Sequence, residues 1–258
     1  MPKKADAYFS SSLEKGLRVL SVFDKQKTEI SLSELSRMLN ISKTSTYRFA
    51  NTLVALGYLK KNPRSKLLTL GTRSFSMAHN ILQSFELVQA IKDTIDDFFE
   101  TTNITIGAAV LDNDALFILY KREALSTVPF RMPIMSKDLY CTALGKAVLA
   151  YLPLQEALNI MERAGMTKRT GNTLVEQAAL LADLKKTKQR GYSLNNQEYI
   201  PGLIAIGAPL INQQTNRVFG SVCLDFLTVE HSARSVEQAY AETVKQIAQE
   251  ISAKIIAD

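Results

Sequence analysis

The segment from residue 31 to residue 56 constrains the fold most, because capping residues mark two short helices and a sharp turn between them. Ser31 and Glu34 have the spacing of a capping box, in which the serine accepts from a first-turn N–H and the glutamate reaches back. An apolar stripe with helical spacing follows at Leu32, Leu35, Met38 and Leu39. Asn40 tolerates the left-handed conformation that ends a helix.

A second helix is predicted to begin only two residues later, because Ser42 is a new N-cap. This helix runs from about residue 43 to residue 56 and stops at Gly57. Two helices joined by so tight a turn cross steeply, which is the helix-turn-helix arrangement. Four apolar residues of the second helix are expected to face the core, namely Phe49, Ala50, Leu53 and Leu56.

The opposite face of the second helix carries side chains suited to DNA. In a helix-turn-helix, the first residues of the second helix enter the major groove. Arg48 suits guanine or phosphate, Asn51 suits adenine, and hydroxyl groups suit phosphate. The predicted DNA-binding residues of this face are Ser42, Lys43, Thr44, Ser45, Tyr47, Arg48 and Asn51. The alternative is an ordinary pair of bundle helices with a solvated polar face.

A basic hairpin is predicted directly after the second helix. Residues 58–61 and 67–70 have the pattern of two short strands, and the five residues between them are rich in turn formers. The tip carries Arg64 and Lys66, which we expect to contact the DNA backbone or minor groove beside the recognition helix. An ordinary basic hairpin is the alternative. A helix over residues 12–23 completes the predicted small core.

Positive charge is concentrated around this predicted DNA-binding segment. Residues 1–75 carry 14 basic and 5 acidic side chains, a net charge of +9, whereas the remainder carries 17 and 20, a net charge of −3. A basic segment joined to a mildly acidic body is typical of a protein whose first part alone contacts phosphates. A simple asymmetry in solubility is the alternative explanation.

The composition sets outer limits on the protein class. The 258 residues allow one large or two moderate domains, and the apolar share of 46% allows a sizeable core. Two cysteines, Cys141 and Cys223, make no disulfide framework. No apolar run approaches the roughly 20 residues that span a bilayer, and no signal peptide is evident. We therefore expect a cytoplasmic protein without a membrane partner.

The second half of the chain alternates between strand and helix patterns. Residues 72–82 and 84–101 are predicted helices, followed by strands at 104–111, 116–120 and 128–132. Helices are predicted at 139–152, 154–164, 173–189 and 232–257, and further strands at 192–198, 203–211 and 218–227. Strands joined by hairpins, with the helices gathered apart from them, favour an α+β fold around an antiparallel sheet.

Three motifs in this order resemble the IclR family of transcriptional regulators. They are SKTSTYRFANTLVALGYL in the winged helix, LYCTALGKAVLAYLP at residues 139–153 and RGYSLNNQEYIPGLIAIGAPLINQQTNRVFGSVCLDF at residues 190–226. The resemblance covers nearly the whole chain. It implies a winged helix-turn-helix domain over residues 1–71, a linker helix over 72–83 and a GAF-like effector-binding domain over 84–258. It also implies homodimers or dimers of dimers, and transcription controlled by a small metabolite.

The resemblance also implies an effector pocket between the sheet and the start of the helix that holds the Gly-Lys motif. Ala143 and Gly145 would let backbone N–H groups approach a ligand there, which favours anions such as carboxylates. The alternative is that both residues only permit close helix–sheet packing. Position by position, the implied effector-binding residues are Tyr140, Cys141, Thr142, Ala143, Leu144, Gly145, Asn195, Asn196, Glu198, Leu203, Ala205, Cys223 and Asp225.

Two positions depart from the family pattern. Tyr140 stands where the family commonly has histidine or another aromatic residue, and Asp225 stands where small polar residues are frequent. If Asp225 faces the pocket, it would repel an anionic effector, pair with Arg131 or select hydroxyl groups. These three possibilities leave the class of the effector open.

The sequence does not favour an enzyme. Its two histidines, His79 and His231, have neither metal-ligand spacing nor a triad-like setting, and no glycine-rich phosphate loop occurs. A cysteine-based hydrolase would need a histidine base, and none stands near either cysteine in the sequence. We expect no catalytic residues, no metal and no cofactor. Two functions remain: a regulator that binds a pseudo-palindromic DNA operator as a dimer, or a ligand sensor acting through protein partners.

Overall fold

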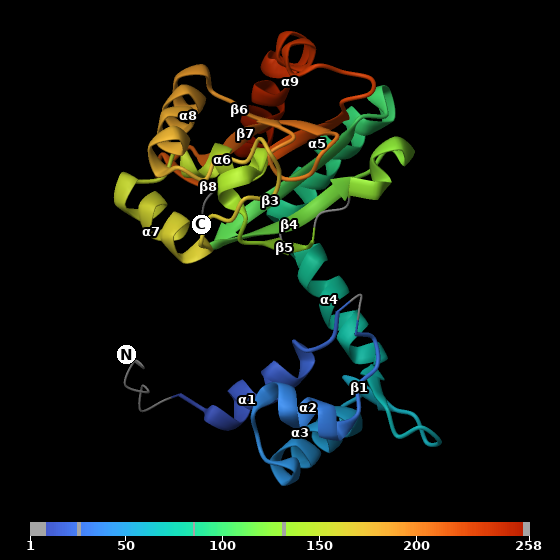
Figure 1. Cartoon of the computed structure of the whole chain (residues 1–258). Coiled ribbons are helices and arrows are strands. Elements are labelled where there is room, and N and C mark those ends of the chain that lie inside the picture. Colours follow the sequence, from blue (N-terminus) through green and yellow to red (C-terminus); the bar gives the residue numbers. More distant parts are fainter. Residues whose placement is uncertain (1–8, 25–26, 85, 131–132, 255–258) are drawn as a thin grey trace. The chain divides into compact units, whose positions relative to one another are not determined.

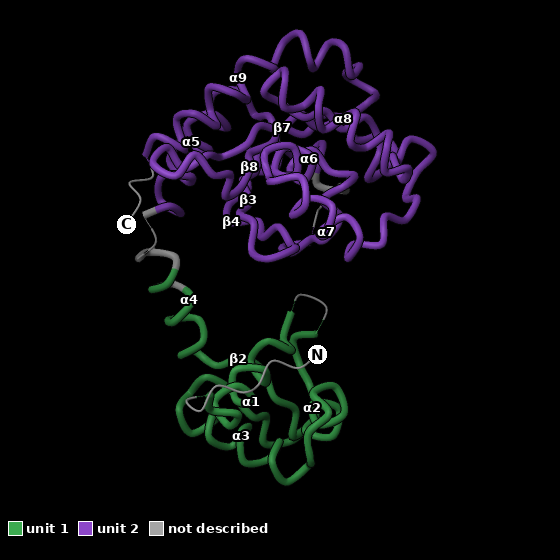
Figure 2. Tube along the Cα trace, turned by 90° about the vertical axis from the view of Figure 1, so that its left-hand side faces the viewer, with its two compact units in different colours: residues 1–84 green, residues 85–258 purple. Residues whose placement is uncertain are grey.

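The computed structural model describes residues 9–24, 27–84, 86–130 and 133–254. The chain divides into two compact units at Ser84 and Phe85, each with its own hydrophobic core (Figure 2). The N-terminal unit is a winged helix-turn-helix, and the C-terminal unit is a mixed helix-and-sheet domain. The predicted α+β fold class is therefore confirmed. Among the described residues, no helix combines the length and the apolar character needed to cross a membrane.

The N-terminal unit packs three helices against a two-stranded wing (Figure 1). Ile30 forms a β-bridge with Leu68, through N–H···O distances of 3.0 and 2.8 Å, which attaches the wing to the chain before the second helix. Helix α4 follows the wing directly, and the Ser74 hydroxyl donates to the Tyr58 carbonyl at 2.7 Å. The elements are α1 (Ser11–Leu20), α2 (Leu32–Leu39), α3 (Lys43–Ala55), β1 (Leu59–Lys61), β2 (Leu68–Leu70) and α4 (Thr72–Ser84).

The expected caps define the two helices of the motif. The Ser31 hydroxyl accepts from the Glu34 N–H at 3.2 Å, and the Ser42 hydroxyl accepts from the Ser45 N–H at 3.2 Å. Between them, Asn40 adopts a left-handed φ of 53°. The Glu34 carboxylate accepts from Lys27 Nζ at 2.9 Å, so an ion pair takes the place of the second half of the capping box.

Two apolar positions of these helices differ from the expected core. Leu56 and Met38 are about half exposed, whereas Leu35, Leu39 and Ala50 are buried. Leu56 is the C-cap residue of α3, where the helix ends and its apolar stripe loses contact with the core. The buried face of α3 instead includes Thr46, whose hydroxyl donates to the Ser42 carbonyl at 3.0 Å.

The C-terminal unit is built on a six-stranded antiparallel sheet with the order β5-β4-β3-β8-β7-β6. Strands β3 and β4 form one hairpin, and β7 and β8 form another. The strands are β3 (Thr105–Asp112), β4 (Ala115–Arg122), β5 (Met135–Ser136), β6 (Ser193–Asn196), β7 (Leu203–Asn212) and β8 (Arg217–Leu227). The helices are α5 (Glu86–Thr102), α6 (Ala143–Leu149), α7 (Leu154–Ala164), α8 (Gln177–Arg190) and α9 (Ala233–Lys254).

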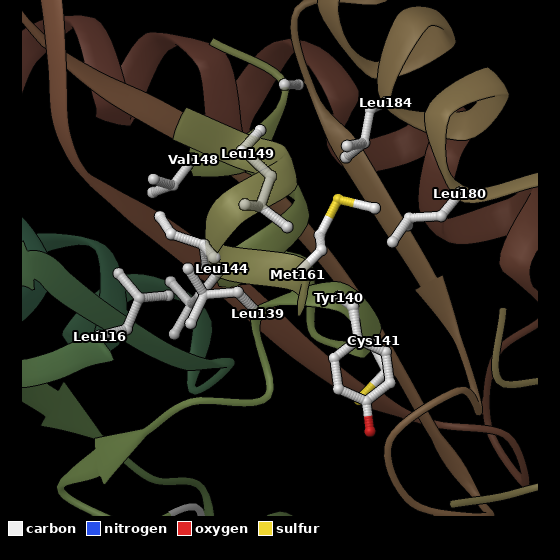
Figure 3. Packing of buried hydrophobic residues seen from close by; sticks show 14 of the residues in the cluster. Leu116, Leu139, Tyr140, Cys141, Leu144, Val148, Leu149, Met161, Leu180 and Leu184 are labelled. Atoms are coloured by element: carbon white, nitrogen blue, oxygen red, sulfur yellow. The ribbon is translucent and has the colours of Figure 1, made fainter. Parts of the chain in front are cut away.

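Each face of the sheet carries a separate core. Helices α5 and α9 cover one face, where Ile95 and Ile251 pack with Ile106, Val222 and Leu224. On the other face, helices α6, α7 and α8 and the chain before α6 form the second core. Figure 3 shows Leu144, Val148 and Leu149 of α6 at the centre of this second core, among Leu116, Met161, Leu180 and Leu184. This second face holds the predicted effector site.

Three predicted elements differ from the structure. Residues 125–130 form a short 3-10 helix rather than part of a strand over 128–132, and residues 131–132 lie outside the described part. Pro129 lacks a donor for a strand ladder, and Met135–Ser136 pairs with β4 instead. The predicted helix over 139–152 divides at Thr142, whose hydroxyl accepts from the Gly145 N–H at 3.0 Å and caps α6. The helix predicted from residue 173 begins at Gln177, because the Thr173 hydroxyl is bonded to the Glu198 carbonyl.

Gly145 is required for the close approach of α6 to the segment before it. A Cβ at this position would lie 2.2 Å from both Cα and the carbonyl oxygen of Leu139. We therefore expect Gly145→Ala to lower the free energy of unfolding by about 1–3 kcal/mol, as overpacked cores do. Gly171→Ala is the control, because no heavy atom lies within 4 Å of its added Cβ. Equal urea midpoints for both variants would contradict this role of Gly145.

Candidate functional site

The outward face of α3 is open to solvent and rich in donors. Ser42, Lys43, Thr44, Tyr47 and Arg48 are exposed, and Ser45 and Asn51 are half-buried. An open hollow of about 420 Å³ lies beside this face, between α3 and the start of α2. Among the described residues, Arg48 takes part in no ion pair, so its guanidinium is available to an outside partner.

The wing places its charges next to this face. Lys61 of β1 lies over the Tyr47 ring, with 5.8 Å between its Nζ and the ring centroid, so strand and recognition helix are adjacent. Arg64 and Lys66 at the tip are exposed. The Asn62 side chain accepts from the Arg64 N–H at 2.9 Å and shapes the turn. The predicted DNA-binding residues of helix and wing therefore share one unit and one exposed, basic region.

Strand register arranges the second site in two rows across one sheet face. One row runs through Lys121, Gly107, Cys223, Gly207 and Ser193, on β4, β3, β8, β7 and β6. The neighbouring row lies two residues along each strand, because side chains of a strand alternate between faces. Its members are Thr105, Asp225, Ala205 and Asn195.

Helix α6 begins directly on the first row. Gly207 leaves room for the Ala143 carbonyl, which would lie 3.1 Å from a Cβ at Gly207. The Ser193 hydroxyl donates to the Ala143 carbonyl at 2.6 Å, and the Ser221 hydroxyl donates to the Leu144 carbonyl at 2.9 Å. Close helix–sheet packing, which the sequence left open as the alternative role of Ala143 and Gly145, is present at Ala143.

A small cavity lies between the start of α6 and the second row. Its volume is about 10 Å³, which is room for roughly one water molecule. Eight of the thirteen residues predicted for the effector pocket line it, together with Tyr199, which sequence reasoning missed. The lining residues are Thr142, Ala143, Leu144, Asn195, Tyr199, Leu203, Ala205, Cys223 and Asp225.

The other five predicted pocket residues lie around the cavity rather than in its wall. Gly145 packs against Leu139, and the Tyr140 hydroxyl donates to the Thr167 carbonyl at 2.7 Å. Figure 3 shows the Tyr140 hydroxyl directed away from the apolar cluster. The Cys141 carbonyl accepts from the Asn195 amide, and Glu198 bonds to Lys146. The backbone carbonyl of the exposed Asn196 accepts from Asn172 Nδ2 at 3.0 Å.

A buried charge cluster connects the two sides of the cavity. Lys146 of α6 is only 1% exposed, and its Nζ lies 2.6 Å from Glu198 Oε1 and 2.9 Å from Asp183 Oδ2. Burial raises the pKa of the Glu198 carboxyl, and nearby Asp183 raises it further, while Lys146 lowers it. The Glu198 N–H donates to Asn195 Oδ1 at 3.1 Å. This cluster therefore ties α6, α8 and the chain after β6 together.

Asp225 faces the cavity and has an ion-pair partner within the sheet. Its Oδ2 lies 3.3 Å from Lys121 Nζ, and the Lys121 stem passes over Gly107. Burial disfavours the Lys121 charge, yet Asp225, Cys223 and Glu123 together raise its pKa above the ordinary value. Of the three possibilities for Asp225, the pairing with Arg131 lies outside the described residues.

Neither cysteine has the setting of a nucleophile. Burial raises the pKa of the Cys141 thiol to about 12 and that of Cys223 well above its usual value. Both are therefore protonated at neutral pH and behave as small apolar residues. Among the described residues, no cluster of three or more His, Cys, Asp and Glu side chains could hold a metal ion.

Comparison with known protein families matches both units of this geometry. Residues 12–63 match the IclR helix-turn-helix domain, and residues 79–253 match the C-terminal domain of the bacterial transcriptional regulator IclR. The chain belongs to the IclR family. This family consists of bacterial transcriptional regulators, so the resemblance carried by the three sequence motifs is confirmed.

Individual IclR-family members are similar over most of their length. The regulator KdgR of Escherichia coli is 27% identical over 95% of this chain and 92% of its own length. XynR of the same organism is 27% identical over 84% of this chain and 86% of its own. An IclR homologue from Microbacterium hydrocarbonoxydans, solved with 4-hydroxybenzoate, has a TM-score of 0.80 at 17% identity, covering 95% and 98% of the chains. KdgR and XynR are both named as transcriptional regulators.

Sequence reasoning missed the residues whose role depends on long-range contacts. Lys121 and Tyr199 carry no motif of their own, and only the strand register and the chain path after β6 bring them to the cavity. The sequence of β4 carries no usable signal for Lys121, because the residues before it form a continuous apolar run and a register shift beside Ala108 and Ala109 decides which face Lys121 takes.

Glu198 should make stability fall as pH rises. Because its pKa in the folded chain is raised above 4.5, the folded state keeps a proton that the unfolded state releases. Stability is therefore lost as pH rises from about 4.5 through the raised pKa. We expect Glu198→Gln to remove this loss, so that the melting temperature of the variant rises relative to that of wild type as the pH increases above 4.5.

The exposed Glu162→Gln is the control and should follow wild type across the range. A constant offset between Glu198→Gln and wild type would show that Glu198 keeps its ordinary pKa.

Proposed function

We propose that this chain is a sequence-specific DNA-binding regulator whose N-terminal unit contacts an operator. The proposed DNA-binding domain spans residues 1–71, with contacts from Ser42, Lys43, Thr44, Ser45, Tyr47, Arg48, Asn51, Arg64 and Lys66. The observation that carries this proposal is the exposed face of α3 with an unpaired Arg48, beside a basic wing and within a segment of net charge +9. These features suit a negatively charged groove better than a protein partner.

We further propose that the chain acts as a homodimer or a dimer of dimers. One helix-turn-helix reads a short half-site, and a dimer places two recognition helices in successive major grooves of a pseudo-palindrome. Helix α1 exposes Leu13 by 63% and Leu17 by 52%, and the linker helix over residues 72–83 exposes Met77 by 45%. A second copy of this chain is the partner that these apolar helix faces suit, since symmetric association would cover them on both copies.

The cavity at the start of α6 is the proposed effector site within residues 84–258. An effector that binds there is proposed to be a small carboxylate, in line with the 4-hydroxybenzoate bound by a structural relative. The present volume of about 10 Å³ is too small for any organic acid, so binding requires the cavity to widen.

The contacts around the cavity indicate which wall moves. The start of α6 is held to the sheet by the Ser193 and Ser221 hydroxyls and by the buried Lys146. The opposite wall is Tyr199, and Arg169 lies over its ring at 4.8 Å while pairing with Asp138 at the surface. Surface ion pairs are weak, so we expect Tyr199 and the loop around Arg169 to yield first.

Loss of Arg48 should weaken DNA binding and its dependence on salt. We expect Arg48→Ala to reduce affinity for promoter DNA at least about tenfold, because the site loses a charge-assisted contact. Wild-type affinity should fall steeply with salt, since binding releases counterions. Gel-shift or anisotropy titrations at several salt concentrations measure both effects.

Arg234→Ala removes the same charge from an exposed position of the C-terminal unit and should leave affinity unchanged. Salt-independent or absent binding by wild type would instead favour the sensor that acts through protein partners.

Charged residues on α1 should separate the proposed dimer. We expect the double variant Leu13→Glu and Leu17→Glu to sediment as a monomer at micromolar concentration, because association would bury the added carboxylates. Leu154→Glu is the matched control, because Leu154 is also 63% exposed but lies on α7. A double variant that sediments like wild type would move the dimer interface elsewhere.

A further inference from the structure

Asp225 stands at the boundary between two hollow regions of the C-terminal unit. It lines the effector cavity and also a second hollow of about 60 Å³. Thr105, Ser126 and Thr127 bring hydroxyl groups to this second hollow, and His231 brings an imidazole. Asp225 itself is 6% exposed, so a carboxylate has been placed between an almost closed cavity and a polar recess. Such a burial is costly unless the carboxylate is satisfied.

The hydrogen bonds that Asp225 receives are fewer than a carboxylate accepts. Among the described residues, Oδ2 lies 3.3 Å from Lys121 Nζ, and Oδ1 accepts only from the Cys223 thiol at 3.6 Å. A thiol is a weak donor, whereas two carboxylate oxygens offer about four acceptor sites. Acceptor capacity therefore remains toward the cavity. An effector without a hydrogen-bond donor would displace water from this carboxylate and leave it unsatisfied.

The charges at this position also restrict the effector. Lys121 is shared between Asp225 and Glu123, whose carboxylate lies 3.5 Å from Lys121 Nζ, so the described residues leave no spare positive charge at this point of the cavity wall. A carboxylate effector is repelled by Asp225 unless Lys121 turns toward it. Lys121 has the freedom to do so, because its ammonium is carried by a flexible four-carbon stem that lies across Gly107. Asp225 then loses part of its partner and needs a replacement donor.

We propose that Asp225 and Lys121 together select an effector that carries at least one hydroxyl group in addition to its carboxylate. The effector hydroxyl donates to Asp225, and the effector carboxylate pairs with Lys121. The second hollow gives the hydroxylated part room beside Asp225 once the cavity widens. This inference rests on the proposed function, in which the cavity is the effector site. In this proposal, Asp225, which stands where the family frequently has small polar residues, determines which effector the cavity accepts.

Pairs of acids that differ only in hydroxyl groups test this selection. We would titrate the full chain by calorimetry with lactate and propionate, gluconate and hexanoate, and 4-hydroxybenzoate and benzoate. For the pair whose size fits, the hydroxylated acid should bind about ten- to a hundredfold more tightly, as expected for a hydrogen bond to a charged group. Asp225→Ser should reduce this preference to less than about threefold.

Two further variants separate selectivity from folding. Asp114→Ser removes a carboxylate that pairs with Arg163 and Lys137 away from the cavity, and it should keep the wild-type preference. If Asp225→Ser melts far below wild type because the buried Lys121 keeps only its ion pair with Glu123 among the described residues, the double variant with Lys121→Met removes both charges and takes its place. This double variant should bind acids of both kinds weakly and without preference.

The outcomes distinguish the inference from the function on which it rests. A preference for hydroxylated acids that Asp225→Ser abolishes supports the inference. Binding of acids without such a preference, or a preference unchanged in Asp225→Ser, overturns the selection by Asp225 and leaves the effector site standing. A wild-type chain that binds none of the six acids overturns the carboxylate effector site itself.

Discussion

The contact between α6 and the sheet is the constraint on which the C-terminal unit depends. The helix begins so close to β7 that a Cβ at Gly207 would lie 3.1 Å from the Ala143 carbonyl oxygen, and serine hydroxyls from β6 and β8 donate to the first carbonyls of the helix. The cavity is small because α6 starts close to the sheet. Lys146 is buried because α6 places its side chain between Glu198 and Asp183.

The buried Lys146 and its two carboxylate partners have a positioning role in this core. One ammonium with two carboxylates leaves an excess of negative charge, and a buried ion pair is weak evidence for stability by itself. Its geometric effect is clearer, because the directional contacts set the position of α6 relative to α8 and the chain after β6. The ion pair of Glu198 with Lys146 therefore helps to position Asn195 in the wall of the cavity, in addition to apolar packing.

Local signals in the sequence predicted the local parts of the structure. Ser31, Asn40 and Ser42 are sufficient to place two helices and a turn, because caps act within one turn of the chain. Thr142 was overlooked as a cap, since an uninterrupted apolar stretch around it has the pattern of a single helix. The partnership of Asp225 with Lys121 was not predictable, because it depends on the register of β3 between β4 and β8. Eight cavity residues were reached through family resemblance rather than through periodicity.

The small volume of the cavity has a kinetic consequence for the proposed effector site. An effector that binds the proposed site enters only during the fraction of time in which the cavity is widened, so its apparent affinity is the intrinsic affinity reduced by that fraction. Association is then governed by the frequency of opening and falls well below the diffusion limit. In the proposed site, the same walls close again over the bound acid and delay its escape.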